Sequence, residues 1–341
     1  MSTPGFSDTA PVRPGEELNI ESLAAYLRGR FGEGALTVEQ FPGGHSNLTY
    51  LVRIGGRECV LRRAPFGPVP PKAHDMAREY HLLDKIHPHF AAAPAVYLLC
   101  EDSTIIGSPF FVMERRRGIV IRGSGDVPHD PTFAGRASRG FLDTLIELHA
   151  IDIHRHGLVS LGKPEGFLER QVKGWAERWQ RAKTQESVAM DSVISWLAAN
   201  RPVSPPPTIV HNDYKLDNVM LNTADPERVE AVLDWEMTTV GDPLADLGLT
   251  LCYWTLGGAY GMPSGEGWLT RDEIVNRYAG ATGRDLSNLN FYEILGIFKL
   301  AVILQQIYFR YVNGQTRDER FRTFGTRVQG LIDNAHAKLP D

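Results

Sequence analysis

The sequence predicts an α+β chain with two lobes, in which a sheet-rich N-terminal part precedes a mainly helical part. Three observations predict this fold class. The 341 residues are long for one compact core, so two lobes are expected. Strand-like segments separated by glycine pairs precede Gly118. Beyond that residue, apolar side chains recur mostly at helical spacing, and short strands interrupt the pattern once.

The N-terminal part is expected to form a five-stranded antiparallel sheet that carries one helix. A first helix is predicted over 20–31, where apolar residues recur at helical spacing. The glycine pair 43–44 interrupts the strand pattern, and the pair 55–56 predicts a hairpin-like turn. A second helix, 74–86, follows the proline-rich loop 65–71. The predicted strands cover 37–41, 48–54, 58–62, 95–99 and 110–114.

The second part is expected to be helical, with a small embedded β-hairpin. Three short strands, 208–210, 219–221 and 229–233, are predicted to pair with one another. Charged and amide side chains such as Lys299 interrupt the apolar stretch 294–311, so we interpret it as a core helix rather than a membrane span. The predicted helices cover 132–150, 167–183, 188–199, 243–256, 271–281 and 290–313.

Three segments follow from these patterns: a flexible tail over 1–18, a first lobe over 19–116 and a second lobe over 117–341. The hinge is predicted near residues 114–117. The tail is rich in proline, serine and glycine and lacks the apolar segment of a signal peptide, so a cytoplasmic protein is expected.

Composition argues against several classes of partner. The formal net charge is −5 and no long basic block occurs, so no nucleic acid partner is expected. No membrane partner is expected either. Cys59, Cys100 and Cys252 lie too far apart in sequence to indicate a disulfide framework or a zinc site. The sequence leaves the oligomeric state open.

The segment 211-HNDYKLDN-218 places polar residues between two apolar strands, and Asp234 ends the next strand. Strand pairing is expected to bring Asp213, Asn218 and Asp234 to one edge of a small sheet. Carboxylate and amide oxygens, completed by substrate phosphates, suit Mg²⁺, and a further carboxylate can orient an acceptor hydroxyl. Protein kinases have this spacing, H-x-D-x-x-x-x-N and then a metal-binding aspartate. The pattern therefore predicts phosphoryl transfer that depends on ATP and Mg²⁺.

The segments HNDYKLDN and VLDWEMTTVGDPLADLG resemble the aminoglycoside phosphotransferase and choline kinase-like family, most closely its kinase-like domain associated with acyl-CoA dehydrogenases. The resemblance covers about residues 20–320 and includes 43-GGHSNLTYLV-52, 60-VLRRAP-65, 78-REYHLL-83 and 109-PFFVMER-115. It implies a two-lobed protein-kinase-like fold. The first lobe would bind the nucleotide, and the second would hold the catalytic loop and the acceptor.

The resemblance implies roles for the residues that match the family's catalytic motifs. Asp213 is expected to be the catalytic base, with Asn218 and Asp234 as Mg²⁺ ligands. His211 is expected to brace the loop. Lys215 is a candidate contact for the γ-phosphate in the transition state, and a solvated loop lysine is the alternative.

The nucleotide contacts implied by the resemblance lie in the first lobe. Arg62 stands where the family usually has a lysine, and Glu79 is its expected helix partner. Arginine keeps the charge, but the two residues are not interchangeable. The phosphates are expected to lie under Gly43, Gly44, His45, Ser46 and Asn47, and the adenine against the backbone of Glu114, Arg115 and Arg116.

Two departures favour a small-molecule kinase over a protein kinase: Trp235-Glu236 follows Asp234 where protein kinases have Phe-Gly, and no activation segment is present. The catalytic loop also has Asn212 where related enzymes commonly have glycine. Asp242 is expected to cap the helix that follows it, and Asp246 to hydrogen-bond the catalytic-loop backbone.

The sequence therefore predicts transfer of the γ-phosphate of ATP to a hydroxyl of a small-molecule acceptor, with a hydroxyacyl-CoA or a related hydroxy metabolite as the candidate. Basic residues in 169–183 favour an anionic or neutral acceptor. The alternatives are an aminoglycoside, choline or sugar kinase and, from another class, a nucleotide-binding pseudokinase acting by interaction. The roles of Glu236, Asp242 and Asp246 as metal or substrate contacts stay open.

Overall fold

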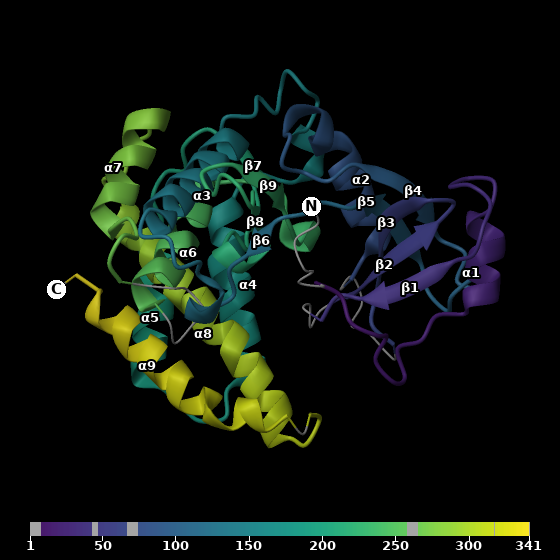
Figure 1. Ribbon diagram of the computed structural model, residues 1–341. Coiled ribbons are helices and arrows are strands. Elements are labelled where there is room, and N and C mark those ends of the chain that lie inside the picture. Colours follow the sequence, from purple (N-terminus) through teal and green to yellow (C-terminus); the bar gives the residue numbers. More distant parts are fainter. Residues whose placement is uncertain (1–7, 43–46, 67–73, 258–264, 317, 341) are drawn as a thin grey trace. The chain divides into compact units, whose positions relative to one another are not determined.

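The computed structural model describes residues 8–42, 47–66, 74–257, 265–316 and 318–340, and the chain divides into two units (Figure 1). The first unit comprises Met1–Gly118 and Glu230–Glu236, and the second comprises Ile119–Val229 and Met237–Asp341. Residues 230–236, predicted in the second lobe, therefore belong to the first unit. Asp234 accordingly lies in the same unit as Arg62.

The first unit is built on a five-stranded antiparallel sheet with the order β1-β2-β3-β5-β4. This confirms the predicted sheet. Its strands are β1 (Thr37–Gln40), β2 (Leu48–Ile54), β3 (Arg57–Arg63), β4 (Val96–Cys100) and β5 (Phe110–Glu114). A further strand of the chain, β9 (Val229–Val232), leads to Asp234.

The two faces of this sheet carry different helices. Helix α1 (Ile20–Leu27) packs on one face, where Tyr50, Leu61 and Phe110 are buried with it in one apolar core. Helix α2 (Met76–Ile86) packs against β4 and β5 (Figure 1). Because side chains alternate along a strand, the residue after Leu61 points to the α2 face. That residue is Arg62.

The described part of the N-terminal tail packs on the first unit, which differs from the predicted flexibility of 1–18. Ala10 exchanges two backbone hydrogen bonds of 2.8 Å with Gln40. The Tyr50 hydroxyl donates to the Glu16 carbonyl at 2.7 Å, and Leu18 is buried. An apolar anchor and these hydrogen bonds outweigh the local preference of a proline- and glycine-rich segment for disorder.

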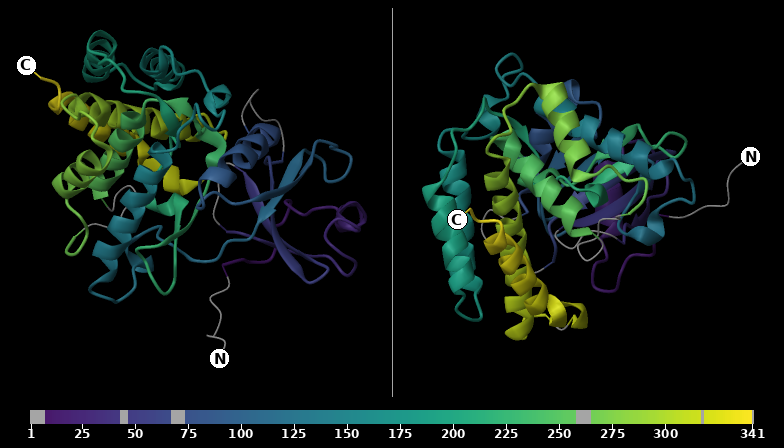
Figure 2. Two further views of the ribbon diagram at one scale, coloured as in Figure 1. Left: turned by 90° about the horizontal axis from the view of Figure 1, so that it is seen from above. Right: turned by 90° about the vertical axis from the view of Figure 1, so that its left-hand side faces the viewer.

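The second unit is mainly helical, and Figure 2 shows its long helices from two further directions. Helix α9, which the sequence analysis did not predict, packs along α8. The helices are α3 (Phe133–His149), α4 (Phe167–Ala182), α5 (Val188–Ala199), α6 (Pro243–Leu256), α7 (Arg271–Thr282), α8 (Leu289–Val312) and α9 (Phe324–Ala337).

The three short strands predicted for the second lobe pair only partly as predicted. Strand β7 (Thr208–Val210) pairs with β10 (Thr239–Gly241), which was not predicted, and β8 (Val219–Leu221) pairs with β6 (Ile119–Val120). The prediction that all three short strands pair with one another is therefore wrong for β7, whereas β8 and β9 are neighbours in one sheet, as predicted. The connecting segment is not a tight turn, because it contains the left-handed residue Asn212 (φ 65°) and a short 3₁₀ turn.

Helices α6 and α8 cross at two glycines. A Cβ on Gly296 would lie 2.8 Å from the Gly248 carbonyl oxygen, and a Cβ on Gly248 would overlap the Tyr292 carbonyl. The crossing therefore requires the absence of a side chain at both positions. Among the described residues, α8 is the one helix long and apolar enough to cross a membrane, but 78% of its apolar stretch is buried in the structure.

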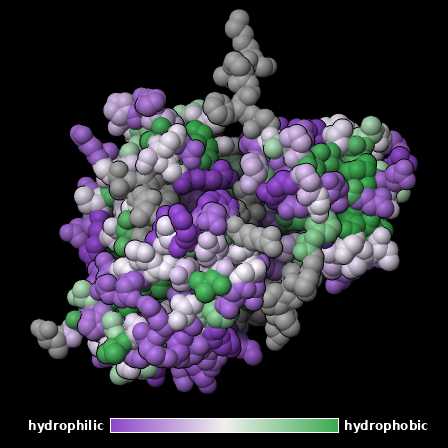
Figure 3. Space-filling view, turned by 90° about the horizontal axis from the view of Figure 1, so that it is seen from below, coloured by the Kyte–Doolittle hydropathy of each residue, from purple (hydrophilic) through white to green (hydrophobic). Residues whose placement is uncertain are grey.

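The two units show different surfaces in the space-filling view of Figure 3. Hydrophilic residues cover much of the visible face of the second unit, and its hydrophobic residues appear there mostly singly. Hydrophobic residues gather on part of the visible face of the first unit. Most apolar side chains of α6 and of the N-terminal half of α8 are buried inside the second unit.

Candidate active site

Arg62 is held on the α2 face of the sheet by a buried carboxylate. Its Nε donates to Glu79 Oε2 at 3.0 Å, and the two residues are 9% and 2% exposed. The predicted ion pair therefore forms. Burial raises the pKa of the Glu79 carboxyl, and the Arg62 guanidinium opposes that shift. The role of the pair in nucleotide binding stays a prediction.

The other side of the Arg62 guanidinium binds Asp234, since Nη2 donates to Asp234 Oδ1. Asp234 follows β9 in a left-handed backbone conformation (φ 63°) that is uncommon for residues other than glycine. Arginine can serve both carboxylates because its planar guanidinium has five N–H donors in a fixed fork. A lysine ammonium, which is a point charge, would have to reach both carboxylates from a single nitrogen.

Glu236, whose role the sequence left open, lies in a polar network of the first unit. Its Oε2 accepts from Asn47 Nδ2 at 3.0 Å and lies 3.6 Å from His74 Nδ1. Arg78 Nη1 donates to the Glu236 carbonyl at 2.7 Å. Burial raises the pKa of the Glu236 carboxyl, and the nearby Asp234 carboxylate adds to the shift.

Of the five residues predicted to cover the phosphates, the structure describes Asn47, which is buried beside Glu236. Gly43, Gly44, His45 and Ser46 lie outside the described residues. Sequence reasoning did not connect Asn47 with Glu236, because 189 positions separate them in the chain.

The residues predicted to face adenine lie at the end of β5. The side chains there are engaged within the first unit: Arg115 pairs with Asp8 and stacks on Phe41 at 4.9 Å, and Arg116 donates to the Glu230 carbonyl at 3.3 Å. Glu114 Oε2 accepts from the Ala95 amide at 3.2 Å. Contact of the 114–116 backbone with adenine stays a prediction.

Of the three residues predicted to share one sheet edge, Asp213 and Asn218 lie together in the second unit, whereas Asp234 belongs to the first unit. Asn218 Nδ2 donates at 2.9 Å to both the Asp213 carbonyl and Asp213 Oδ2. The Lys215 ammonium lies 3.5 Å from Asp213 Oδ2 and 3.6 Å from Asp217 Oδ2. His211 is fully buried, and its Nδ1 accepts from the Asp213 amide at 3.3 Å, which is the predicted brace.

Asp246 on α6 anchors this loop. Its carboxylate accepts from the His211 amide at 2.5 Å and from the Asn212 amide at 2.6 Å, which confirms the predicted contact. Burial raises the pKa of the Asp246 carboxyl, but hydrogen bonds from His149 and the loop backbone outweigh burial and hold the pKa below its ordinary value. Asp242 caps α6 through the Leu244 amide at 2.9 Å, also as predicted.

Three buried residues of this region were missed by sequence reasoning. His149 on α3 contacts Asp246 at 3.3 Å and the Tyr278 hydroxyl at 2.8 Å. Lys299 on α8 donates to the Asn212 carbonyl. A charged residue within an apolar helix was a usable signal for Lys299, whereas nothing local distinguishes His149 or Tyr278.

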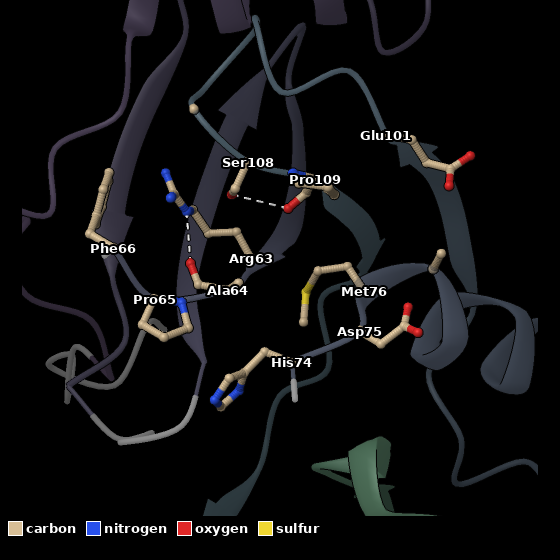
Figure 4. A pocket seen from close by; sticks show the side chains of 12 residues that line it. Arg63, Ala64, Pro65, Phe66, His74, Asp75, Met76, Glu101, Ser108 and Pro109 are labelled. Carbon is tan, nitrogen blue, oxygen red and sulfur yellow. Dashed lines mark hydrogen bonds between the residues drawn. The ribbon is translucent and has the colours of Figure 1, made fainter. Parts of the chain in front are cut away.

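A cavity of about 350 Å³ in the first unit lies apart from the predicted site residues, none of which lines it (Figure 4). Arg63, Phe66, Met76 and Pro109 contribute to its wall. The Arg63 guanidinium lies 3.8 Å from the centre of the Phe66 ring. The predicted nucleotide contacts therefore do not correspond to this cavity.

Metal binding requires ligands beyond the protein side chains. Among the described residues, no group of three or more His, Cys, Asp or Glu side chains is arranged to hold a metal ion. Mg²⁺ commonly uses one or two carboxylates, with substrate phosphates and water completing the octahedron. The Asp234 carboxylate in the first unit and the Asn218 amide in the second unit are each an oxygen donor of a kind that Mg²⁺ accepts.

Residues 37–284 match the profile of the phosphotransferase enzyme family. The chain is 32% identical over 345 residues to mouse acyl-CoA dehydrogenase family member 10, covering 97% of this chain and 32% of the relative. It is 34% identical over 342 residues to rat acyl-CoA dehydrogenase family member 11, covering 96% of this chain and 44% of the relative. The chain thus spans between about a third and less than half of these relatives.

Solved structures agree with the kinase-like fold. A Ralstonia eutropha protein assigned as an aminoglycoside phosphotransferase superposes with a TM-score of 0.83 at 29% identity, over 94% of this chain and 98% of its own. Aminoglycoside phosphotransferase APH(4)-Ia, in complex with AMP-PNP and hygromycin B, superposes with a TM-score of 0.61 at 18% identity, over 93% of this chain and 98% of its own. The latter likeness shows the fold alone.

Proposed function

The chain belongs to the phosphotransferase enzyme family, and from that premise we propose that it transfers the γ-phosphate of ATP to a hydroxyl group of a small-molecule acceptor. The observation that carries the proposal is the pairing of Asp213 with Asn218 at 2.9 Å in the loop before β8. Phosphoryl transfer needs little covalent chemistry from the protein, so it depends on a positioned carboxylate and on oxygen ligands for the metal.

Asp213 is the proposed base. Its side chain is 23% exposed, so an acceptor can reach the carboxylate while Asn218 fixes its orientation. The carboxylate accepts the hydroxyl proton as the acceptor oxygen bonds to the γ-phosphorus, while the bond from that phosphorus to the bridging oxygen breaks and ADP leaves. The Lys215 ammonium lies 3.5 Å from Asp213 Oδ2. It therefore places a positive charge beside the proposed base, where it can stabilise the negatively charged phosphoryl group during transfer.

Asn218 and Asp234 are the proposed Mg²⁺ ligands. Because Asn218 Nδ2 donates to Asp213, the amide is oriented with Oδ1 as its remaining acceptor. Asp234, in the first unit, offers a carboxylate whose position Arg62 fixes. When bound, Mg²⁺ would partly neutralise the negative charge of the ATP phosphates, and Asn218 and Asp234 would hold it.

Arg62 is the proposed phosphate contact of the first unit. Glu79 binds its Nε and Asp234 binds its Nη2, so the guanidinium plane is fixed by two carboxylates. The same planar group can bind phosphate oxygens through its remaining N–H donors. This arrangement supports the proposal that an arginine serves here in place of the family's usual lysine.

For the acceptor, we propose a hydroxylated acyl-CoA or a related hydroxy metabolite. Two observations support this class. The relatives bear the name acyl-CoA dehydrogenase family member. In addition, α4 carries several basic residues, and a positively charged helix favours an anionic acceptor. One of these residues is Arg178, whose guanidinium carbon lies 4.5 Å from the centre of the Trp175 ring. Aminoglycosides are polycations and would favour acidic surroundings instead.

The test is a screen for ATP consumption with Mg²⁺ present, in which hydroxyacyl-CoAs, aminoglycosides, choline analogues and sugars are supplied one at a time. We expect acceptor-dependent ADP release with a hydroxyacyl-CoA and its absence in Asp213→Asn. ATP binding without turnover for every acceptor would instead favour a nucleotide-binding pseudokinase. Turnover with aminoglycosides alone would contradict the acceptor class.

A further inference from the structure

Lys299 is a buried cation on a helix that is otherwise mostly apolar. It lies near the middle of α8, is 7% exposed and directs its ammonium to a backbone carbonyl, that of Asn212. The Trp175 ring centre lies 5.6 Å from the same ammonium. Burying a charge is costly unless its partners compensate, so a lysine here requires a structural or functional reason.

The carbonyl that Lys299 holds belongs to the residue directly before Asp213. Asn212 has a left-handed backbone (φ 65°), which is unfavourable for residues other than glycine and tolerated best by asparagine and aspartate. Its amide donates to Asp246 Oδ1 at 2.6 Å, and its side chain donates to the Met237 carbonyl at 3.1 Å. Lys299 supplies the remaining contact, at the carbonyl oxygen.

The contact at the Asn212 carbonyl also affects Asp213, because the peptide bond between the two residues is planar. The Asn212 carbonyl and the Asp213 amide belong to one rigid plane, so a ligand on the oxygen also fixes the orientation of the next residue. On the other side of that plane, the Asp213 amide donates to His211 Nδ1 at 3.3 Å. Asp246 and Lys299 thus hold the turn from two different helices.

We propose that Lys299 is a positioning residue for Asp213, acting through the Asn212 carbonyl. The proposal rests on the proposed function only for its catalytic consequence, because the ordering of the 211–213 turn is a property of the chain itself. Without the ammonium, the peptide between Asn212 and Asp213 loses its contact at the carbonyl oxygen and keeps only the 3.3 Å hydrogen bond from the Asp213 amide to His211, so it can rotate more easily out of the left-handed turn. The Asp213 carboxylate then spends less time in its reactive orientation.

The experiment is hydrogen exchange, followed by mass spectrometry, on the full chain carrying Lys299→Met. We expect the amides of residues 208–218 to exchange about 10-fold faster or more, because a buried hydrogen bond to a charged donor is lost. Peptides from α3 should be unchanged. Lys299→Gln, which keeps an N–H donor but no charge, should fall between wild type and Lys299→Met, and it decides the question if Lys299→Met does not fold.

Glu293→Gln is the matched control. Glu293 is also a buried charged residue of α8, but it pairs with Arg271 and Lys338 rather than with the catalytic loop. We expect this variant to leave exchange over 208–218 at the wild-type rate. Unchanged loop exchange in the Lys299 variants, or an increase spread equally over α3, would overturn the proposal.

Turnover measurements on the same variant test whether the order of the 211–213 turn affects catalysis. With the best acceptor, or with water as acceptor in the slow hydrolysis of ATP, Lys299→Met should lower kcat by about 10²-fold, the cost of a small misplacement of a reacting group. The Kd for Mg-ATP should stay near that of wild type. Normal kcat with a loosened loop would overturn the positioning role, whereas absence of turnover in the wild type would overturn the proposed function and leave the exchange experiment decisive.

Discussion

Replacing Asp213 by asparagine distinguishes a catalytic role from a structural one. The expected change in the activation free energy is much larger than the expected change in the free energy of unfolding. Asparagine has nearly the same shape, and its carbonyl can still accept the 2.9 Å hydrogen bond from Asn218. The interaction that is lost is the partly exposed contact with Lys215 at 3.5 Å. Such exposed pairs contribute about 0–1 kcal/mol, so the free energy of unfolding should fall by no more than about that amount.

The catalytic loss should be larger. Removing a general base typically costs about 10²–10⁴-fold in rate, which corresponds to about 3–5 kcal/mol of activation free energy. We therefore expect Asp213→Asn to melt near the wild-type temperature and to bind Mg-ATP normally, while kcat falls by that factor. A thermal melt, a nucleotide titration and a turnover assay measure the three quantities.

Asp217→Asn is the control for Asp213→Asn. Asp217 lies in the same loop and contacts the same lysine, at 3.6 Å, so this variant removes an equivalent ion pair without touching the proposed base. We expect its kcat to change by less than about 10-fold, well below the general-base range. Equal losses in the two variants, or near-normal turnover in Asp213→Asn, would refute the role of Asp213.

Three further predictions concern the metal, the phosphate contact and the loop anchor. Asp234→Ala should abolish the tightening of ATP binding by Mg²⁺ or Mn²⁺ in titration calorimetry, and an undiminished metal effect would remove Asp234 from the ligand set. Arg62→Ala should raise the KM for ATP more than the KM for the acceptor. Arg62→Lys should restore only part of the loss, since an ammonium cannot reproduce a bidentate contact. Full activity in Arg62→Ala would argue against Arg62 as the phosphate contact. The Asp246 pKa is depressed in the folded chain, so its stabilising contribution is present above the unfolded value of about 3.9 and is lost as pH falls through the folded value. Asp246→Asn should therefore lower the free energy of unfolding at pH 7 by about 3 kcal/mol and flatten its decline below about pH 4, as thermal melts across pH can establish; an unchanged acid limb would contradict this account.

The fold was predictable where local patterns and spacing agree. The strands of the first unit alternate and are punctuated by glycine pairs, and the five-stranded sheet formed with nearly the predicted bounds. Strand partners in the second unit were not predictable in the same way. Strands of three residues carry too little pattern to choose a partner, and β7 pairs with β10 rather than with β8.

The contacts of the candidate site also fall into two groups, those that the sequence predicted and those that only the structure shows. Motif spacing predicted that Asp213 meets Asn218, because the two residues lie five positions apart in one motif. The contact of Asp246 with the loop backbone was also predicted, although 34 positions separate Asp246 from Asn212. The contacts of Asn47 with Glu236 and of Lys299 with Asn212 span 189 and 87 positions, so only the packed chain reveals them.

The glycine crossing of α6 and α8 places the two anchors of the catalytic loop close to one point. Asp246 lies two residues before Gly248, and Lys299 lies three residues after Gly296. A side chain at either glycine would push the helices apart and displace both anchors together. In a survey of natural or random variants, Gly248 and Gly296 should therefore tolerate no replacement, and their loss should resemble active-site damage although neither residue contacts the reacting groups.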